Sequence, residues 1–203
     1  MLLVAPVFLA VATLALTIHG RWTSILSTGT VAFVAISMAF LLGTALLEAI
    51  GALRSVQGLV ANTEWPMGVW LFASLGAATF AMFAVADHAA PRLLRRDWGG
   101  SRLSDIQLWS MLIGASVAGL ALMGAGIAHG SLVAEAAAGD VIQATLAWYW
   151  LVAGAGLGLA ALAGLAALVS LFVMYTSARR AEYAIGPESA PAAGAPAGVR
   201  AAH

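Results

Sequence analysis

The chain has 203 residues, of which 62% are hydrophobic and only 9% are charged. A soluble domain carries about 25% charged residues, so this composition excludes an ordinary water-soluble globular protein. The sequence contains no cysteine and has a net charge of zero. Disulfides and thiolate metal sites are therefore excluded, and nothing indicates binding to nucleic acid.

Five apolar stretches follow one another along the chain, at 2–18, 27–52, 67–85, 106–128 and 144–175. About 20 apolar residues are needed to cross the hydrocarbon core of a bilayer, and backbone groups in lipid must pair within their own segment. The first stretch lacks a basic leader and a convincing cleavage site, so we interpret it as a span rather than a signal peptide. The sequence therefore predicts an all-α membrane helix bundle over residues 1–181, with about five transmembrane helices.

The arginines indicate how such a bundle is oriented. Five spans place the loop at 19–26, the loop at 89–105 and the C-terminus on one side of the membrane. That side carries Arg21, Arg92, Arg95, Arg96, Arg102, Arg179, Arg180 and Arg200, whereas the other side carries Arg54 alone. Because basic loops stay in the cytoplasm, the sequence predicts a cytoplasmic C-terminus and an N-terminus outside.

The C-terminal segment 182–203 differs in composition from the rest of the chain. It is rich in alanine, proline and glycine, and such a segment cannot bury enough apolar surface to fold. We therefore expect it to form a flexible cytoplasmic tail.

Glycines are dense in the last two predicted spans. Gly126 and Gly130 stand four residues apart, as do Gly154 and Gly158. This spacing lets helix backbones approach closely in a membrane. It predicts helix contacts at these four positions, either within the chain or with a partner.

Ionisable groups at membrane depth are costly and often functional, and this chain has few. The four histidines are His19, His88, His129 and His203; the first three fall at the ends of predicted spans and the last ends the tail. Glu48, near the predicted outer interface, and Asp87, near the inner one, are candidates for a proton path. No phosphate-binding loop, nucleophile motif or metal-spaced histidine cluster is present, so we assign no catalytic and no metal-ligating residue.

Several motifs occur in an order and spacing that resemble the last five helices of the catalytic subunit of the cbb-type haem–copper cytochrome c oxidases. They are Leu3-Val4-Ala5-Pro6 with His19-Gly20-Arg21-Trp22, the stretch 54–59 with Thr63-Glu64-Trp65, Pro91-Arg92-Leu93, and Gln107-Leu108-Trp109 followed by Ile113-Gly114, Ala125-Gly126 and Gly130. The resemblance covers about 180 residues. It implies a membrane respiratory complex in the bacterial inner membrane.

The sequence departs from this family where the family binds haem. The resemblance implies two haem-ligating histidines, one residue apart, on the helix after Thr63-Glu64-Trp65, and those places hold Val69 and Leu71. Neither side chain can coordinate iron. Trp70 and Phe72 would also add bulk where the family leaves space for haem, and the family's other ligands lie on helices that precede the stretch matched here.

This departure favours a haem-free, non-catalytic subunit that packs against other membrane subunits of a respiratory complex. The implied partners carry the haem, and a c-type cytochrome is a candidate among them. One alternative is the C-terminal half of a split haem–copper oxidase or nitric oxide reductase completed by another chain. Further alternatives are a haem or quinone carrier that uses His88 or His129, and a transporter. Arg54 and Glu64 are candidates for docking a partner at the outer face.

Overall fold

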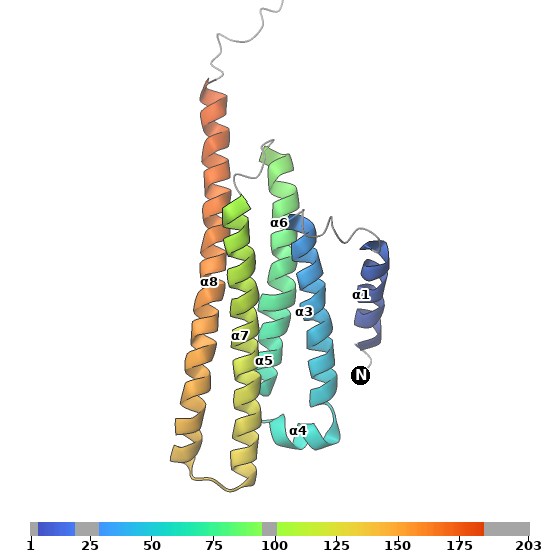
Figure 1. Ribbon diagram of the computed structural model, residues 1–203, viewed down its shortest axis with the longest axis vertical. Coiled ribbons are helices and arrows are strands. Elements are labelled where there is room, and N and C mark those ends of the chain that lie inside the picture. The colour runs from blue at the N-terminus through green and yellow to red at the C-terminus, as the bar shows by residue number, and fades with distance from the viewer. Residues whose placement is uncertain (1–3, 19–28, 95–100, 185–203) are drawn as a thin grey trace, which may run out of the picture.

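The computed structural model describes residues 4–18, 29–94 and 101–184, and these are helical nearly throughout (Figure 1). In chain order the elements are α1 (Val4–Ile18), α3 (Gly29–Gly51), α4 (Arg54–Val60), α5 (Trp65–Leu71), the π-helix η1 (Phe72–Ala78), α6 (Thr79–Leu94), α7 (Ser101–Ala134) and α8 (Gly139–Ala184). The predicted all-α class is confirmed for this part of the chain.

Among the described residues, four helical stretches are long and apolar enough to cross a membrane: Thr30–Gly51, Trp65–Leu93, Leu103–Ala134 and Gly139–Thr176. They correspond to the second to fifth predicted spans. The first predicted span begins outside the described residues, and its described part, α1, has 15 residues. At 1.5 Å per residue this helix covers about 22 Å, short of the roughly 30 Å of hydrocarbon. That it spans the bilayer, and the orientation of the bundle, stay predictions.

The helices extend beyond the predicted spans. The last two are continuous over 101–134 and 139–184, against predictions of 106–128 and 144–175. Apolar runs mark the part of a helix that suits lipid, whereas its backbone hydrogen bonds continue into polar flanks such as Ser101–Asp105. Residues 182–184 are likewise helical rather than part of a tail, while the rest of the predicted tail, with His203, lies outside the described residues.

The π-helix η1 interrupts the third span between α5 and α6, and the sequence analysis did not predict it. In its wider turn the hydroxyl of Thr79 donates to the carbonyl of Ser74, five residues back, at 2.9 Å. Ser37 on α3 donates to the carbonyl of Ala77 at 2.7 Å in a buried position. Local side chains and a neighbouring helix therefore satisfy carbonyl groups along the irregular backbone.

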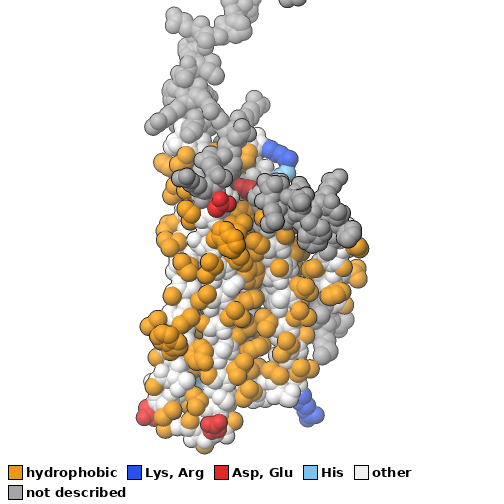
Figure 2. All heavy atoms as spheres, in the orientation of Figure 1, with side chains coloured by type: hydrophobic (Ala, Val, Ile, Leu, Met, Phe, Trp, Pro, Cys, Tyr) orange, Lys and Arg blue, Asp and Glu red, His pale blue; other side chains and the backbone are white. Residues whose placement is uncertain are grey.

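The long helices lie side by side, and α4 crosses one end of the bundle (Figure 1). The largest buried cluster joins α3, η1, α6, α7 and α8 through Phe33, Phe40, Ala77, Phe80, Ala84, Met111, Ala115, Ala160 and Ala163. Phenylalanine rings fill its centre, with Phe40 and Phe80 stacked at 5.8 Å between ring centroids. On the outside, apolar side chains cover the middle of the bundle and charged ones gather at its two ends, as expected for a membrane protein (Figure 2).

A tight turn joins α7 to α8. The N–H of Ala137 donates to the carbonyl of Leu132 at 3.0 Å, and the N–H of Ala136 donates to Val133 at 3.1 Å. Ala136 has φ of 54°, in the left-handed region. This is the Schellman arrangement that ends many helices, with alanine at the position where glycine is usual.

Candidate functional site

The end of the bundle near α4 brings together most of the polar side chains that the sequence singled out. Thr63 shapes the turn between α4 and α5: its hydroxyl donates to the carbonyl of Val60 at 2.8 Å and accepts from the N–H of Trp65 at 3.4 Å. Pro66 occupies the first turn of α5, where its missing N–H costs nothing. The turn thus fixes Glu64 and Trp65 at the start of a membrane-spanning helix.

Two glycines of α7 hold this turn close to the bundle. A Cβ atom at Gly126 would overlap the backbone nitrogen of Trp65, and one at Gly130 would overlap the carbonyl oxygen of Leu59. The absence of side chains at both positions therefore lets the α4–α5 backbone lie directly on α7. Gly126 and Gly130 thus make close contacts within the chain.

Glu64 and His129 form a hydrogen bond across the same junction. His129 Nδ1 donates to Glu64 Oε2 at 2.9 Å, and the two side chains are 27% and 16% exposed. The contact connects the start of α5 to the end of α7, one residue before Gly130. Glu64 is therefore committed to an internal contact, which weakens its predicted role in docking a partner.

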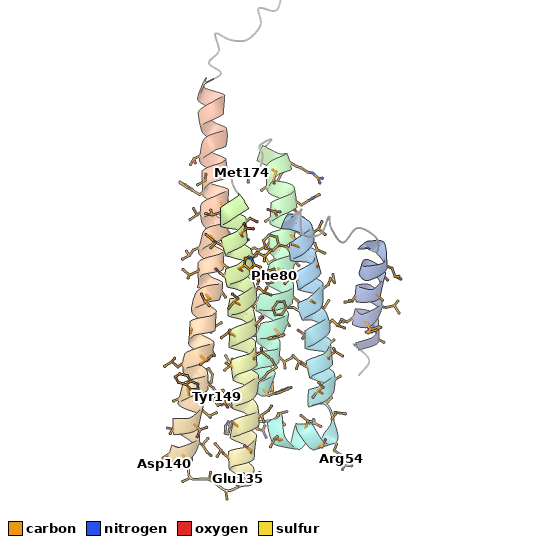
Figure 3. The ribbon with its side chains drawn as sticks, viewed as in Figure 1. Arg54, Phe80, Glu135, Asp140, Tyr149 and Met174 are labelled. Atoms are coloured by element: carbon orange, nitrogen blue, oxygen red, sulfur yellow. The ribbon has the colours of Figure 1, made fainter. Side chains whose placement is uncertain are left out.

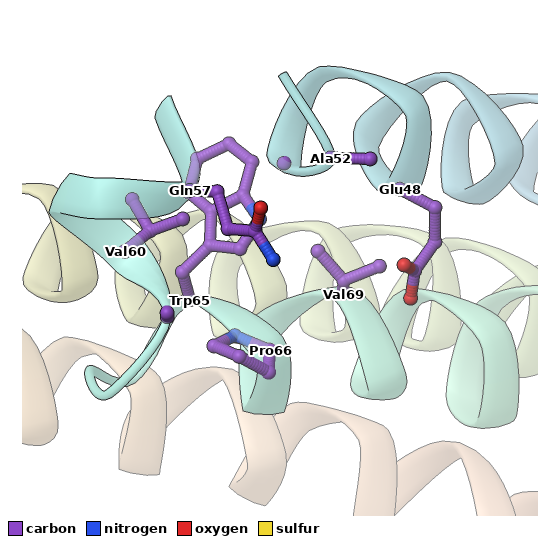
Figure 4. A pocket seen from close by; sticks show the side chains of 9 residues that line it. Glu48, Ala52, Gln57, Val60, Trp65, Pro66 and Val69 are labelled. Carbon is purple, nitrogen blue, oxygen red and sulfur yellow. The ribbon is translucent and has the colours of Figure 1, made fainter. Parts of the chain in front are cut away.

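A half-open groove lies beside this junction, between α3, α4 and α5 (Figure 4). Its volume is about 300 Å³, and it is lined by Glu48, Gly51, Ala52, Gln57, Val60, Ala61, Trp65, Pro66 and Val69. Glu48 comes from α3, Gln57 from α4 and Trp65 from α5. Glu48, an acidic candidate in the sequence, thus lines a groove.

Val69 and Leu71 occupy two separate buried environments on α5. Val69 is 2% exposed and packs with Val60, Trp65 and Met123. Leu71 is 6% exposed and packs with residues of α7 and α8, namely Ala118, Leu122 and Ala153. Since residues two apart point to different sides of a helix, the two positions face different clusters of aliphatic side chains.

The helix between these clusters lies against α7 without intervening side chains. A Cβ at Gly68 would come within 2.7 Å of the carbonyl oxygen of Gly119, so α5 and α7 meet backbone to backbone. Phe72 fills the space over Gly119 and packs edge-on against Phe40, with 5.1 Å between ring centroids. Trp70 differs from the expectation for it, because it is 65% exposed and lies outside the bundle interior.

Comparison with protein families identifies the fold to which these helices belong. Residues 1–181 match the family model described as "Cytochrome C and Quinol oxidase polypeptide I". The chain belongs to this family. It is a multi-pass membrane protein of the haem–copper oxidase subunit I family, whose members belong in general to respiratory oxidase complexes. A search of curated proteins finds no match.

The two residues of α5 that the resemblance places at the family's haem-ligand positions lack a ligand for iron. The resemblance places its ligands at Val69 and Leu71, and neither aliphatic side chain has a donor atom for iron. Both positions are buried in packed clusters, and the helix between them touches α7 directly. In the described part of the chain, moreover, no three His, Cys, Asp or Glu residues come together as a metal site.

Asp87 and His88, the other described titratable candidates, lie on α6, away from the end of the bundle that α4 crosses. Asp87 accepts a hydrogen bond from the hydroxyl of Thr30 on α3 at 2.7 Å. His88, four residues before Arg92, contacts it on the exposed side of the helix. Asp87 is therefore held between two helices, apart from the Glu64–His129 junction. His19 lies outside the described residues.

Two predicted contact residues and one predicted docking residue are found on open surfaces. Gly154 and Gly158 of α8 have no neighbouring atom within 4 Å of a Cβ built on them. Within the chain, the contact between α7 and α8 is made instead by Gly114 and Gly156, where a Cβ would meet backbone atoms of the facing helix. A contact of Gly154 and Gly158 with a partner therefore stays a prediction. Arg54 is exposed at the α4 end of the bundle (Figure 3).

Sequence reasoning missed the roles of Gln57, Trp65 and Gly68. Trp65, which entered only as part of a family motif, is buried and lines the groove. The available signal was the turn composition at 61–66, where Thr63, Glu64 and Pro66 mark a helix start beside an apolar run. Nothing in the sequence identified which face of α4 turns toward α3.

Proposed function

We propose that this chain is a non-catalytic, haem-free subunit of a larger respiratory complex in the bacterial inner membrane. Its role is to pack against other membrane subunits and support their assembly, and the haem resides in those partners. One observation carries the proposal. Both positions that correspond to the family's haem ligands hold aliphatic side chains buried in separate packed clusters.

The packing around α5 supports the haem-free part of the proposal. A planar macrocycle beside Val69 or Leu71 would have to displace Met123 on one side or Leu122 on the other, and both are 3% exposed or less. Such side chains sit in interiors as dense as organic crystals. Replacing Leu71 with histidine would therefore supply a ligand without supplying space.

The exposed face of α8 supports the packing part. Small residues at Gly154 and Gly158 leave open positions on a helix whose other side is occupied by α7. Association of membrane helices depends on close packing at small residues. A partner helix would find there the kind of surface that α7 already offers within the chain at Gly114.

The test is to isolate the complex in mild detergent from cells with and without this chain, and to measure haem per complex by pyridine haemochrome absorbance. We expect the same haem content per mole of partner subunits in both preparations, with fewer intact complexes when the chain is missing. Haem that is lost with the chain while the partners remain assembled would overturn the proposal and favour a split enzyme.

Two double variants test whether any haem absorbance of the complex depends on the α5 positions or on the histidines of this chain. Val69→Ala with Leu71→Ala removes the side chains at the family ligand positions, and His88→Ala with His129→Ala removes the two described histidines. We expect neither pair to change the Soret band of the purified complex. A change in the histidine pair alone would instead support a haem carrier.

A further inference from the structure

Three polar groups on the wall of the groove have no partner within the described residues. The Glu48 carboxylate, the Gln57 amide and the Trp65 indole N–H all line it, and none makes a side-chain hydrogen bond or ion pair there. Trp65 is only 9% exposed. No fully buried polar side-chain atom in the described structure lacks a partner, so this indole N–H reaches the surface of the groove.

These groups define the chemistry of a ligand. A carboxylate accepts only, an indole N–H donates only, and an amide does both. The wall therefore offers an anionic acceptor on α3 and donors on α4 and α5. Its complement is a small zwitterion with a cationic hydrogen-bond donor and an anionic oxygen acceptor.

The position of the groove indicates that such a zwitterion belongs to a lipid. The candidate spans Thr30–Gly51 and Trp65–Leu93 end and begin at the groove, so its polar groups lie where the lipid headgroups meet the hydrocarbon. The rest of the lining includes the apolar side chains of Val60, Pro66 and Val69. Exposed apolar side chains of Ile50 and Met67 continue outside it.

We propose that the groove binds the headgroup of an ethanolamine phospholipid. The primary ammonium donates to Glu48, and phosphate oxygens accept from the Gln57 amide and the Trp65 indole N–H. The acyl chains then run along the apolar surface of α3 and α5. A volume of about 300 Å³ is at the lower end of small-molecule sites, which suits a headgroup whose chains remain in the bilayer.

The same arrangement of polar groups should bind choline and glycerol headgroups more weakly than ethanolamine. A choline headgroup is cationic but has no N–H to donate to Glu48. A glycerol headgroup has no cation and would bring its phosphate charge near an unneutralised carboxylate.

The experiment is a lipid titration of the purified full-length chain in detergent, followed by native mass spectrometry. The probes are phosphatidylethanolamine, phosphatidylcholine and phosphatidylglycerol with identical acyl chains. We expect a saturable site for phosphatidylethanolamine with about tenfold weaker binding of the other two, the factor that loss of one charge-assisted hydrogen bond predicts. Equal binding of all three lipids would overturn the proposal.

The variant Glu48→Gln tests the ammonium contact, and we expect about tenfold weaker binding of phosphatidylethanolamine. Its matched control is Glu135→Gln, because Glu135 is an exposed carboxylate at the same end of the bundle, on the turn after α7 (Figure 3). We expect the control to bind as the unchanged chain does. Equal effects of both substitutions would show attraction to surface charge only and would overturn the site.

Two milder variants test the phosphate contacts without changing charge. Gln57→Leu keeps a side chain of similar size on an exposed position, and Trp65→Phe keeps an aromatic ring in the core while removing the N–H. Each should weaken phosphatidylethanolamine and phosphatidylcholine by a similar factor, because both lipids carry the phosphate. Unchanged affinity in both variants would contradict the assigned headgroup orientation. These results do not depend on whether the chain is haem-free.

Discussion

The helices α7 and α8 are both rich in glycine and alanine, but they use these residues differently. Half of the apolar stretch of α7 is buried, against 22% for α8. On α7 the glycines at 114, 119, 126 and 130 each meet a neighbouring helix or turn, whereas Gly154 and Gly158 of α8 face open space. Position in the bundle, and not composition, thus decides whether a small residue makes a contact.

The difference shows why the same spacing supports two kinds of role. Contacts of α7 extend to α8, α5, η1 and α4, so its glycines are surrounded. The helix α8 packs chiefly on one side, against α7. A membrane imposes little penalty on an open apolar face, because lipid tails are as apolar as the residues they cover. The open positions of α8 can therefore face lipid without a large cost in stability.

The largest effect should come from adding one methyl group to α7. Gly126→Ala places a Cβ against the backbone of Trp65, which cannot move without displacing the start of α5. We expect a loss of about 2–3 kcal/mol in stability, measured by reversible unfolding in mixed micelles. Gly154→Ala is the matched control on α8, and we expect no loss there. Equal losses at both positions would contradict the comparison.

A smaller loss is expected where the neighbour is a side chain. A Cβ at Gly119 would overlap the ring of Phe72, and a ring can shift where a backbone cannot. We expect Gly119→Ala to cost about 1–2 kcal/mol, part of which Phe72→Leu should restore in the double variant. The same unfolding assay with Gly158→Ala provides the reference for an open position. A cost as large as that of Gly126→Ala would show that the ring is fixed.

A polar contact of α7 should likewise contribute more stability than a polar contact of α8. His129 of α7 donates to Glu64 of another element, whereas Thr145 of α8 donates to the carbonyl of Val141 in its own helix. Breaking the first contact should cost about 1 kcal/mol, measured as the coupling energy in a cycle of His129→Ala and Glu64→Ala. Thr145→Val should change stability by about 0.5 kcal/mol or less. A coupling energy of zero would contradict the proposed link between α5 and α7.

The smallest effect, a gain, is expected at the turn that joins the two helices. Ala136 adopts a left-handed conformation with φ of 54°, which is unfavourable for any residue with a Cβ. Ala136→Gly should raise stability by about 0.5 kcal/mol, because the greater freedom of unfolded glycine offsets part of the relief. Thermal denaturation of the two chains side by side measures the gain. A lower melting temperature would mean that the alanine methyl group makes a contact that outweighs the strain.

The sequence predicted the fold well because lipid restricts the choices. Apolar runs located all four long spans, and the position of Gly126 and Gly130 indicated close contact. The groove could not be predicted in this way. It depends on how α4 turns back toward α3 after Leu53, and on the side of α5 that Trp65 occupies, and both follow from packing between helices far apart in the chain. The choice of Gly156 over Gly154 as the contact on α8 is likewise set by the rotation of the whole helix.

The π-helix η1 changes the direction in which the later residues of the third span point. A π-turn contains about one residue more than an α-helical turn, so every residue after Ala78 is rotated by about 100° relative to an uninterrupted α-helix. Phe80, which is 0% exposed and stacks on Phe40, owes its inward direction to that extra residue. A deletion of one residue within Phe72–Ala78 that converts η1 into an ordinary α-helix would therefore leave Phe80 facing the core. Straightening the same turn without a deletion would instead rotate Phe80 by about 100°, toward lipid.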